Sequence, residues 1–220
     1  MATDAQAASA FYASPRGVVA ARMLRTCLDR VWPSIGGDEI LGLGYAGPFL
    51  RPWRDRAYRC VAVPTDCGVE EDALPFPDLT FDRILLVHGL ETADNARALL
   101  RECWRVLKDS GRLVAVVPNR TGIWAYAEGT PFGHGHPYSE GQLSRLLAAN
   151  LFRVERFDAA LWVPPLRMRP VLRSAPAIER VGRRVFPGLA GVTVAEAVKD
   201  IYAAMPVRAV ARRRLVAVEA

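Results

Sequence analysis

Residues 39–47 read EILGLGYAG, a short apolar segment that runs directly into a glycine-rich turn. The turn has the spacing GxGxxG, in which glycines let the chain turn tightly and bring backbone N–H groups close to a ligand. Glycines at strand-to-helix turns also serve close packing, so the spacing alone leaves packing and ligand binding open. The stretch predicts a strand whose end is suited to a nucleotide-type ligand.

Strands and helices alternate on both sides of this turn. A helix is expected over 14–32, since Ser14 is a good N-cap residue and Pro15 suits the first helical turn. The alternation predicts a single α/β domain over 1–220, with a doubly wound, mostly parallel sheet and an insertion at 160–190. The expected strands are 39–43, 60–63, 84–87, 113–117, 152–157 and 192–197, and the further helices are 95–107, 139–150 and 177–186.

Length and composition exclude several classes of protein. The chain has 220 residues, of which 51% are hydrophobic and 24% charged, as in folded globular domains and unlike disordered chains. No apolar run approaches the roughly 20 residues of a membrane-spanning helix, and the first thirty residues lack the pattern of a signal peptide. The four cysteines show no CxxC pairing. We therefore expect a cytoplasmic protein with no metal site.

Two further segments carry a resemblance to a known family. Residues 70–82 read EEDALPFPDLTFD, and residues 101–113 read RECWRVLKDSGRL. With the glycine turn, they resemble the Rossmann-like, S-adenosylmethionine-dependent methyltransferases of the ubiquinone-biosynthesis-like, small-molecule type. That family reads roughly DAxxLPFxDxxFD and then ExxRVLKPGG at these places. The resemblance covers about residues 36–117 and implies a seven-stranded sheet with an antiparallel last strand.

The resemblance also implies the cofactor S-adenosylmethionine and a set of residues that bind it. The matching positions are Gly42, Gly44, Tyr45 and Gly47 for the turn under the methionine part, Glu70 (with Asp72 as the second choice) and Ala73 for the loop beside adenine, and His88 for the pocket wall near the sulfonium.

Two acids that the family uses are displaced in this chain. The acid two residues before the first motif glycine is replaced by Ile40, and Glu39 beside it faces the other side of the strand. The ribose-binding acid is expected near Pro64, and the nearest candidate is Asp66. Two readings follow: an enzyme that methylates a small, partly apolar molecule, or a catalytically silent methyltransferase-like module that binds and regulates a partner protein.

The loop after the fourth expected strand contains two of the three histidines. It leaves the carboxyl end of a central strand, where ligands bind in doubly wound sheets. Because the pKa of histidine lies near working pH, His134 is the candidate base that deprotonates the acceptor, with a role in loop structure and metal ligation as alternatives. The other residues expected on the acceptor side are Asn119, Trp124, Tyr126, Phe132, His136 and Tyr138.

The excess of positive charge lies in the last third of the chain. Residues 151–220 contain 13 basic and 6 acidic residues, whereas residues 1–150 contain 16 and 17. The Arg-rich segment 167–184 within the insertion predicts a lid over the sheet, or a contact with a protein partner or an anionic membrane surface. Nucleic acid is not expected as a partner, because no known binding module is present.

Overall fold

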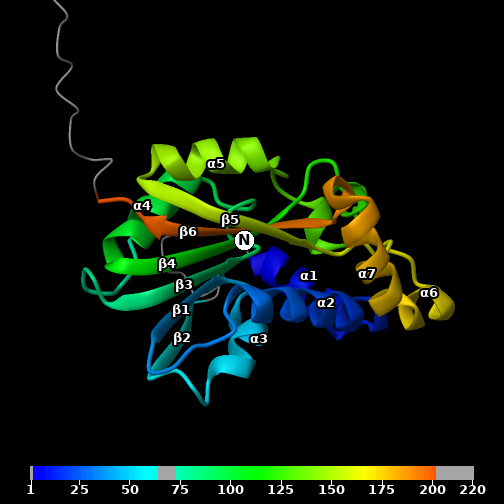
Figure 1. Cartoon of the computed structure of the whole chain (residues 1–220), viewed down its shortest axis with the longest axis horizontal. Coiled ribbons are helices and arrows are strands. Elements are labelled where there is room, and N and C mark those ends of the chain that lie inside the picture. The colour runs from blue at the N-terminus through cyan, green and yellow to red at the C-terminus, as the bar shows by residue number, and fades with distance from the viewer. Residues whose placement is uncertain (1, 64–72, 202–220) are drawn as a thin grey trace, which may run out of the picture.

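A six-stranded sheet forms the centre of the fold, and the computed structural model describes residues 2–63 and 73–201 (Figure 1). The order across the sheet is β2-β1-β3-β4-β6-β5, in which β6 runs antiparallel to β4 and β5 and the pairs among β1 to β4 are parallel. The doubly wound, mostly parallel sheet with an antiparallel last strand is thereby confirmed. The strands are β1 (Glu39–Gly44), β2 (Arg59–Val63), β3 (Phe81–Val87), β4 (Leu107–Pro118), β5 (Phe152–Ala160) and β6 (Val192–Lys199).

The seven strands implied by the resemblance are one more than the described residues contain. The described part of the connection from β2 to β3 holds Pro75 and Pro77, which lack the N–H that a strand ladder needs. Side chains of α4 (Ala96–Val106) hold this segment instead. Arg105 donates to the carbonyl of Leu74 at 2.9 Å, and Glu102 accepts from the N–H of Leu74 at 2.9 Å.

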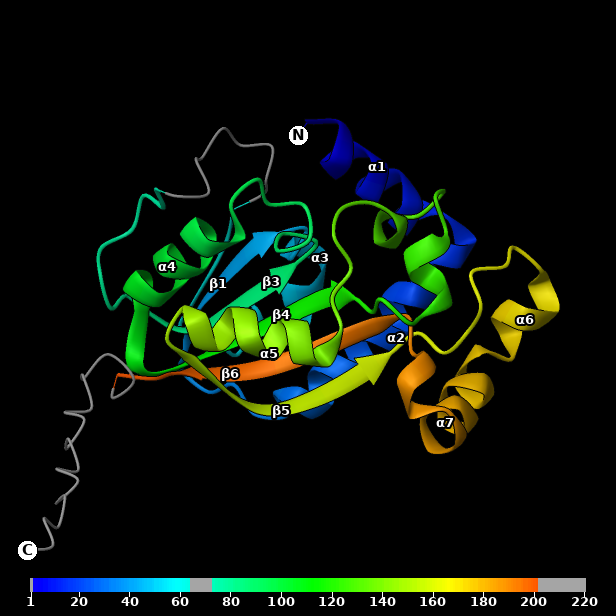
Figure 2. The same ribbon diagram turned by 90° about the horizontal axis from the view of Figure 1, so that it is seen from above.

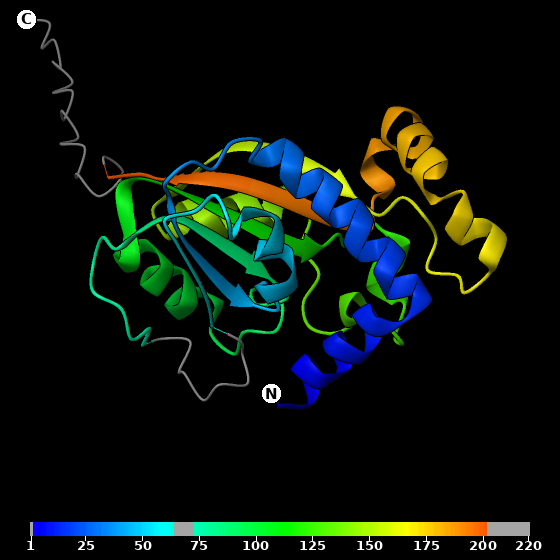
Figure 3. The ribbon, with the colours of Figure 1, turned by 90° about the horizontal axis from the view of Figure 1, so that it is seen from below.

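Helices cover both faces of the sheet (Figures 2 and 3). One face carries α1 (Ala2–Ala13), α2 (Pro15–Val31) and the four-residue α3 (Gly47–Leu50), and the other carries α4 and α5 (Glu140–Ala149). The helix expected over 14–32 is α2, whose N-cap Ser14 accepts from the N–H of Gly17 at 3.1 Å. No sequence pattern predicted α1. The last turn of α1 packs closely against the first turn of α2, because a Cβ on Gly17 would lie 1.9 Å from the carbonyl oxygen of Phe11.

Both faces of the central strand β3 are buried, as its apolar run predicts. Leu85 and Val87 face the cluster under α1 and α2, whereas Ile84 and Leu86 face the cluster under α4 and α5. The carboxyl ends of β1, β3 and β4 lie next to α1 and the loop 119–138 (Figure 3). Doubly wound sheets bind ligands at this end of their strands.

The insertion between β5 and β6 contains α6 (Arg169–Arg173) and α7 (Ala175–Val185). Its anchor is Glu179 of α7, whose two carboxylate oxygens accept from the N–H groups of Leu161 and Trp162 at 2.8 and 2.9 Å. On the apolar side of α7, Ile178 packs partly buried against the core, whereas Val181 and Val185 are 58% and 55% exposed. In the described part of the chain, no helix has the length and hydrophobicity of a membrane span.

Candidate functional site

The glycine turn after β1 packs its backbone against the end of β3. Gly44 has a φ of +68°, which favours glycine, and a Cβ there would lie 2.4 Å from the carbonyl oxygen of Val87. The N–H of Tyr45 donates to that same carbonyl at 2.6 Å. A Cβ on Gly42 would meet a side chain of α3 at 2.5 Å, whereas one on Gly47 would meet nothing closer than 3.9 Å. Packing therefore requires glycine at 42 and 44 but not at 47.

His88, directly after β3, belongs to a buried chain of three hydrogen-bonded side chains. Its Nδ1 lies 2.9 Å from Oε1 of Glu91, and its Nε2 lies 2.8 Å from the hydroxyl of Tyr12. His88 and Glu91 are 6% and 1% exposed, and His88 has a left-handed φ of +53°. A carboxylate on Nδ1 fixes the orientation and the tautomer of an imidazole, while backbone strain tends to gather at functional sites. The arrangement can therefore accept a proton at Nε2.

The two partners of His88 were missed by the sequence reasoning. Glu91 has a recognisable signal, a His-x-x-Glu spacing just past the end of a strand. Tyr12 has none, because it lies on α1, 76 residues away in the chain. The site is therefore completed by a helix that the sequence did not indicate.

Aromatic rings surround this chain of hydrogen bonds. Tyr12 stacks on Tyr45 of the glycine turn, with ring centroids 5.2 Å apart, and Phe132 lies edge-on to His88 at 4.7 Å. Trp124 packs on Phe132 at 5.2 Å and donates from Nε1 to a backbone carbonyl of the insertion at 2.7 Å. The fold thus brings together the glycine turn, His88 and two aromatic residues that the sequence assigns to the acceptor side.

One carboxylate oxygen of Glu91, Oε2, lies buried beside this cluster and has no hydrogen-bond partner among the described residues. Burial raises the pKa of Tyr12 well above its ordinary value, and the carboxylate of Glu91 raises it further. An unpartnered carboxylate oxygen favours a cationic or N–H-bearing ligand next to it. S-adenosylmethionine carries a sulfonium and an ammonium charge, so these residues fit that cofactor.

The loop 119–138 packs over Glu91. Gly135 has a φ of +76°, and a Cβ there would lie 2.2 Å from the carbonyl oxygen of Glu91. The N–H of His136 donates to that carbonyl at 2.9 Å. At the ends of the loop, Asn119 donates from its side-chain amide to two carbonyls before β6 at 3.1 and 2.9 Å, and the hydroxyl of Tyr138 lies 3.5 Å from a carbonyl next to Glu91. Asn119 and Tyr138 thus hold the loop in place.

The remaining residues predicted in this loop lie at the surface. Tyr126 is 75% exposed and donates to the carbonyl of Arg120 at 3.2 Å. His134 and His136 are also exposed, and in the described part of the chain neither imidazole forms a hydrogen bond. The structure therefore brings Phe132 and Trp124 next to His88 but not His134, whose role as a base stays a prediction.

Part of the expected cofactor site lies outside the described residues. Ala73, the first residue described after the gap, is exposed. Glu39 forms ion pairs with Arg59 at 3.0 Å and Lys108 at 3.3 Å at the amino end of β1, so it does not replace the acid that Ile40 displaces. The expected residues that lie outside are Asp66, Glu70 and Asp72.

Residues 32–115 match the protein family described as "Methyltransferase domain". A demethylmenaquinone methyltransferase from Thermus thermophilus is 28% identical over 125 residues, which cover 56% of this chain and 57% of that protein. A ubiquinone/menaquinone biosynthesis C-methyltransferase from an Enterobacter species is 47% identical over 45 residues, covering 20% of this chain and 18% of that protein. The chain thus spans less than two thirds of the length of these curated relatives.

Solved structures match most of the chain. An S-adenosylmethionine-dependent methyltransferase from Mesorhizobium loti has a TM-score of 0.58 at 15% identity and covers 86% of this chain and 100% of that one. A chain from the Haloferax volcanii complex that contains the Trm112 methyltransferase activator has a TM-score of 0.61 at 18% identity, with 82% and 90% covered. At such identities the likeness shows a shared fold. Taken with the family match over residues 32–115, it shows that the chain has the Rossmann-like fold of S-adenosylmethionine-dependent methyltransferases and that its residues 32–115 are similar to their methyltransferase domain.

Proposed function

We propose that this chain transfers a methyl group from S-adenosylmethionine to a small, partly apolar acceptor. The observation that carries the proposal is the buried chain Glu91–His88–Tyr12, which lies against the glycine turn. The cofactor, when bound, supplies an electrophilic methyl group on its sulfonium. The residues proposed to hold it are Gly42, Gly44, Tyr45 and Gly47 on the methionine side, Asp66, Glu70, Asp72 and Ala73 on the adenosine side, and His88 near the sulfonium.

Methylation of an acidic O–H, N–H or C–H acceptor releases a proton, and His88 is well placed to take it. The hydrogen-bond pattern that satisfies all three groups has Tyr12 donating to Nε2 and Nδ1–H donating to Glu91. The acceptor's proton reaches His88 through Tyr12, whose hydroxyl passes its own proton to Nε2 as it takes the acceptor's, and the carboxylate of Glu91 stabilises the imidazolium that results. Alignment of the acceptor with the methyl group supplies much of the acceleration, and the surrounding aromatic rings exclude water.

The acceptor side consists of the loop 119–138 and the insertion in this proposal. Buried Phe132 and Trp124 provide an apolar wall, Asn119 and Tyr138 fix the loop, and exposed Tyr126 and His136 form its outer surface. The names of the relatives favour an acceptor of the quinone class, since those proteins are demethylmenaquinone and ubiquinone/menaquinone methyltransferases. A reduced demethylmenaquinone with a short side chain is therefore the first acceptor to assay.

Cofactor binding is tested by isothermal titration with S-adenosylmethionine and with its demethylated product. The unchanged chain should bind both, and Gly44→Asp should abolish binding because of the close approach to Val87. Gly36→Asp is the matched control, since a Cβ at Gly36 meets nothing within 4 Å. Absence of binding of both molecules at millimolar concentration would exclude the proposed enzyme.

The base is tested by comparing His88→Gln and Glu91→Gln with His134→Ala and His136→Ala. We expect His88→Gln to lower turnover at saturating cofactor by a factor on the order of 10² to 10⁴, a larger loss than its effect on cofactor affinity. If His134→Ala loses turnover and His88→Gln keeps it, the base is the one that the sequence indicated. The silent binding module is not favoured, because the named relatives are methyltransferases.

We also propose that the Arg-rich segment 167–184 attaches this cytoplasmic protein to an anionic membrane surface. The insertion exposes Met168, Val181, Val185 and Phe186, and its single acid, Glu179, is turned inward. Exposed apolar residues among arginines are typical of such attachment.

Vesicle co-sedimentation tests the attachment to a membrane. Binding should require anionic lipid and should be lost on Arg180→Glu with Arg184→Glu, but not on Arg97→Glu with Arg101→Glu on α4. Absence of binding to anionic vesicles would instead favour a protein partner, and the Haloferax neighbour is itself part of a complex with an activator.

A further inference from the structure

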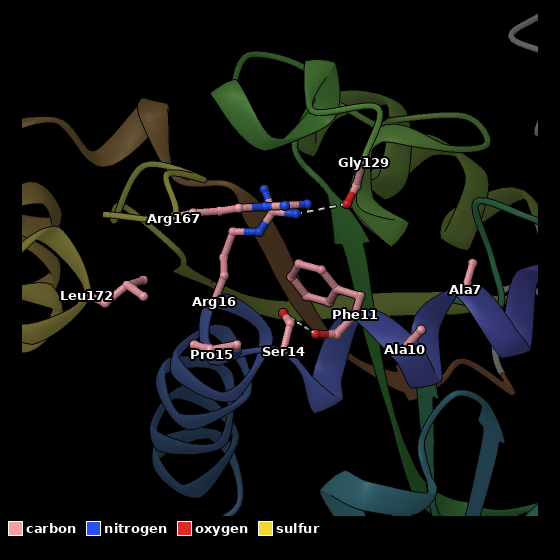
Figure 4. Close-up of a pocket in the computed structure, with 9 residues that line it drawn as sticks. All are labelled: Ala7, Ala10, Phe11, Ser14, Pro15, Arg16, Gly129, Arg167 and Leu172. Atoms are coloured by element: carbon pink, nitrogen blue, oxygen red, sulfur yellow. Dashed lines mark hydrogen bonds between the residues drawn. The ribbon is translucent and has the colours of Figure 1, made fainter. Parts of the chain in front are cut away.

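A pocket of about 430 Å³ lies where α1 meets α2, at the base of the insertion (Figure 4). This volume falls within the range of small-molecule sites, roughly 300–1,000 Å³. None of the residues that line it is among those proposed to bind the cofactor or to act as the base. Its apolar wall consists of Ala7, Ala10, Phe11 and Leu172, and its basic side chains are Arg16 and Arg167.

Arg16 is fixed in the pocket by neutral partners. Its Nη1 donates to the carbonyl of Pro165 at 3.0 Å, and its Nη2 donates to the carbonyl of Gly129 at 2.9 Å. Its guanidinium lies over the ring of Phe11, 5.3 Å from the centroid. The Nε of Arg16 is buried and has no hydrogen-bond partner among the described residues. A donor held in this way is preorganised for an acceptor that the described residues do not supply.

The charge of the pocket is not neutralised by the described part of the protein. There, no carboxylate forms an ion pair with Arg16 or Arg167. Burial lowers the pKa of Arg16, and repulsion from the guanidinium of Arg167 lowers it further. Figure 4 shows the two guanidinium groups on the same side of the pocket, above the ring of Phe11. The negative charge of an anion between the two guanidinium groups would relieve this repulsion. Guanidinium groups form bidentate hydrogen bonds with carboxylates and phosphates.

We propose that this pocket binds a small amphipathic anion, with its carboxylate or phosphate on Arg16 and Arg167 and its apolar part along the wall formed by α1 and Leu172. The site combines a preorganised pair of like charges, an apolar wall and a volume suited to a small molecule. The proposal concerns binding and does not depend on methyl transfer. The anion can be a free molecule or the headgroup of an anionic lipid, which offer the same chemistry to the two arginines.

The test is titration calorimetry of the full chain with decanoate, decyl phosphate, decanol and decyltrimethylammonium, below their micelle concentrations. At least one of the two anionic probes should bind ten times more tightly than the neutral and the cationic probe. Vesicles that contain phosphatidic acid form the second arm. Displacement of the soluble anionic probe by the vesicles would identify a lipid headgroup, whereas binding of that probe without displacement identifies a free molecule.

Arg167→Gln provides the decisive variant, because Arg167 is exposed and Arg16 also ties two loops together. This variant should lower the affinity for the anionic probe at least tenfold without changing the unfolding temperature or the affinity for S-adenosylmethionine. Arg169→Gln removes the same charge two residues away and outside the pocket, and it should change the affinity less than twofold. Equal losses in the two variants, tight binding of decanol, or binding of none of the soluble probes would each overturn the proposal.

Discussion

Tyr12 and His88 share a hydrogen bond of 2.8 Å although 76 residues separate them in the chain. The bond joins the first helix to the carboxyl end of the central strand, where ligands bind in this type of sheet. The ring of Tyr12 also stacks on Tyr45, so a single residue of α1 contacts both the glycine turn and the buried histidine.

Replacement of Tyr12 by Phe should isolate the contribution of this hydrogen bond. The ring and its stacking on Tyr45 are kept, while Nε2 of His88 loses its partner. We expect the free energy of unfolding in urea to fall by about 1–3 kcal/mol, because a buried polar group is left unsatisfied. Tyr126→Phe removes a hydroxyl from an exposed side chain and should cost less than about 0.5 kcal/mol. Equal effects of the two variants would contradict the assigned bond.

The glycines of the turn should respond differently to alanine. Gly44→Ala forces a Cβ against the carbonyl of Val87 at a positive φ, so it should lower the free energy of unfolding by about 1–3 kcal/mol or more. Gly47→Ala meets no close neighbour, and the stability should be retained. If Gly47 is needed for close approach to the cofactor, this variant should lose affinity for S-adenosylmethionine at unchanged stability. Urea unfolding and calorimetry on the same preparations separate the two effects.

Glu102 should give the chain a measurable acid sensitivity. Hydrogen bonds from Arg105 hold the pKa of Glu102 below its ordinary value, against the opposing effect of burial, and the N–H of Leu74 adds to them. A carboxylate with a lowered pKa in the folded state stabilises the protein above its unfolded pKa, and this contribution is lost as the pH falls through the folded pKa.

The measurement is the free energy of unfolding of the wild-type chain and of Glu102→Gln from pH 7 to pH 3. The two should differ fully above about pH 5 and converge below the ordinary glutamate pKa of about 4.3. Glu128→Gln, in an exposed loop, is the control for an amide in place of a carboxylate. A difference that does not shrink toward low pH would contradict the assigned pair.

Glu179 should be the residue that fixes the insertion. Its replacement by Ala leaves the buried N–H groups of Leu161 and Trp162 without acceptors, and Leu161 already has a positive φ of 68°. We expect a loss of about 2–4 kcal/mol in the free energy of unfolding, together with faster proteolysis within 161–191. The exposed neighbour Arg180→Ala should leave both quantities nearly unchanged. A stable, protease-resistant Glu179→Ala chain would show that other contacts hold the insertion.

Local chemistry made much of the fold predictable. The six strands named from the sequence are present because each is an apolar run bounded by Gly, Pro or a helix signal, and buried strands need little else for their recognition. The caps at Ser14 and Ser139 depend on a side chain and an N–H three residues away, which a sequence displays directly. His88 was placed at the end of the central strand for the same reason.

Contacts between distant segments were not predictable. The hydrogen bond between Tyr12 and His88 depends on the angle at which α1 packs against the start of α2 at Gly17. No local pattern in the sequence of α1 specifies that angle. In α7, the 3.6-residue spacing of the apolar residues predicts that they share one side of the helix, but it does not predict whether that side faces the protein or the solvent. The inward side is decided by Gly182, which lets Trp162 approach the helix, and by Glu179, which binds the turn after β5. For that reason the valines of α7 face outward.

The two ends of the insertion meet at a hydrogen bond of 2.9 Å from the N–H of Gly191 to the carbonyl of Leu161, next to the paired residues Ala160 and Val192. The 29 residues between Leu161 and Gly191 leave and re-enter the sheet at one point, as a hairpin loop does. Closing a longer or shorter loop there costs only about 0.6 kcal/mol per doubling of length. Evolution can therefore exchange this segment while the strands and the glycine turn stay unchanged, so that under the proposed function acceptor preference can diverge between descendants of one ancestor faster than the cofactor site does.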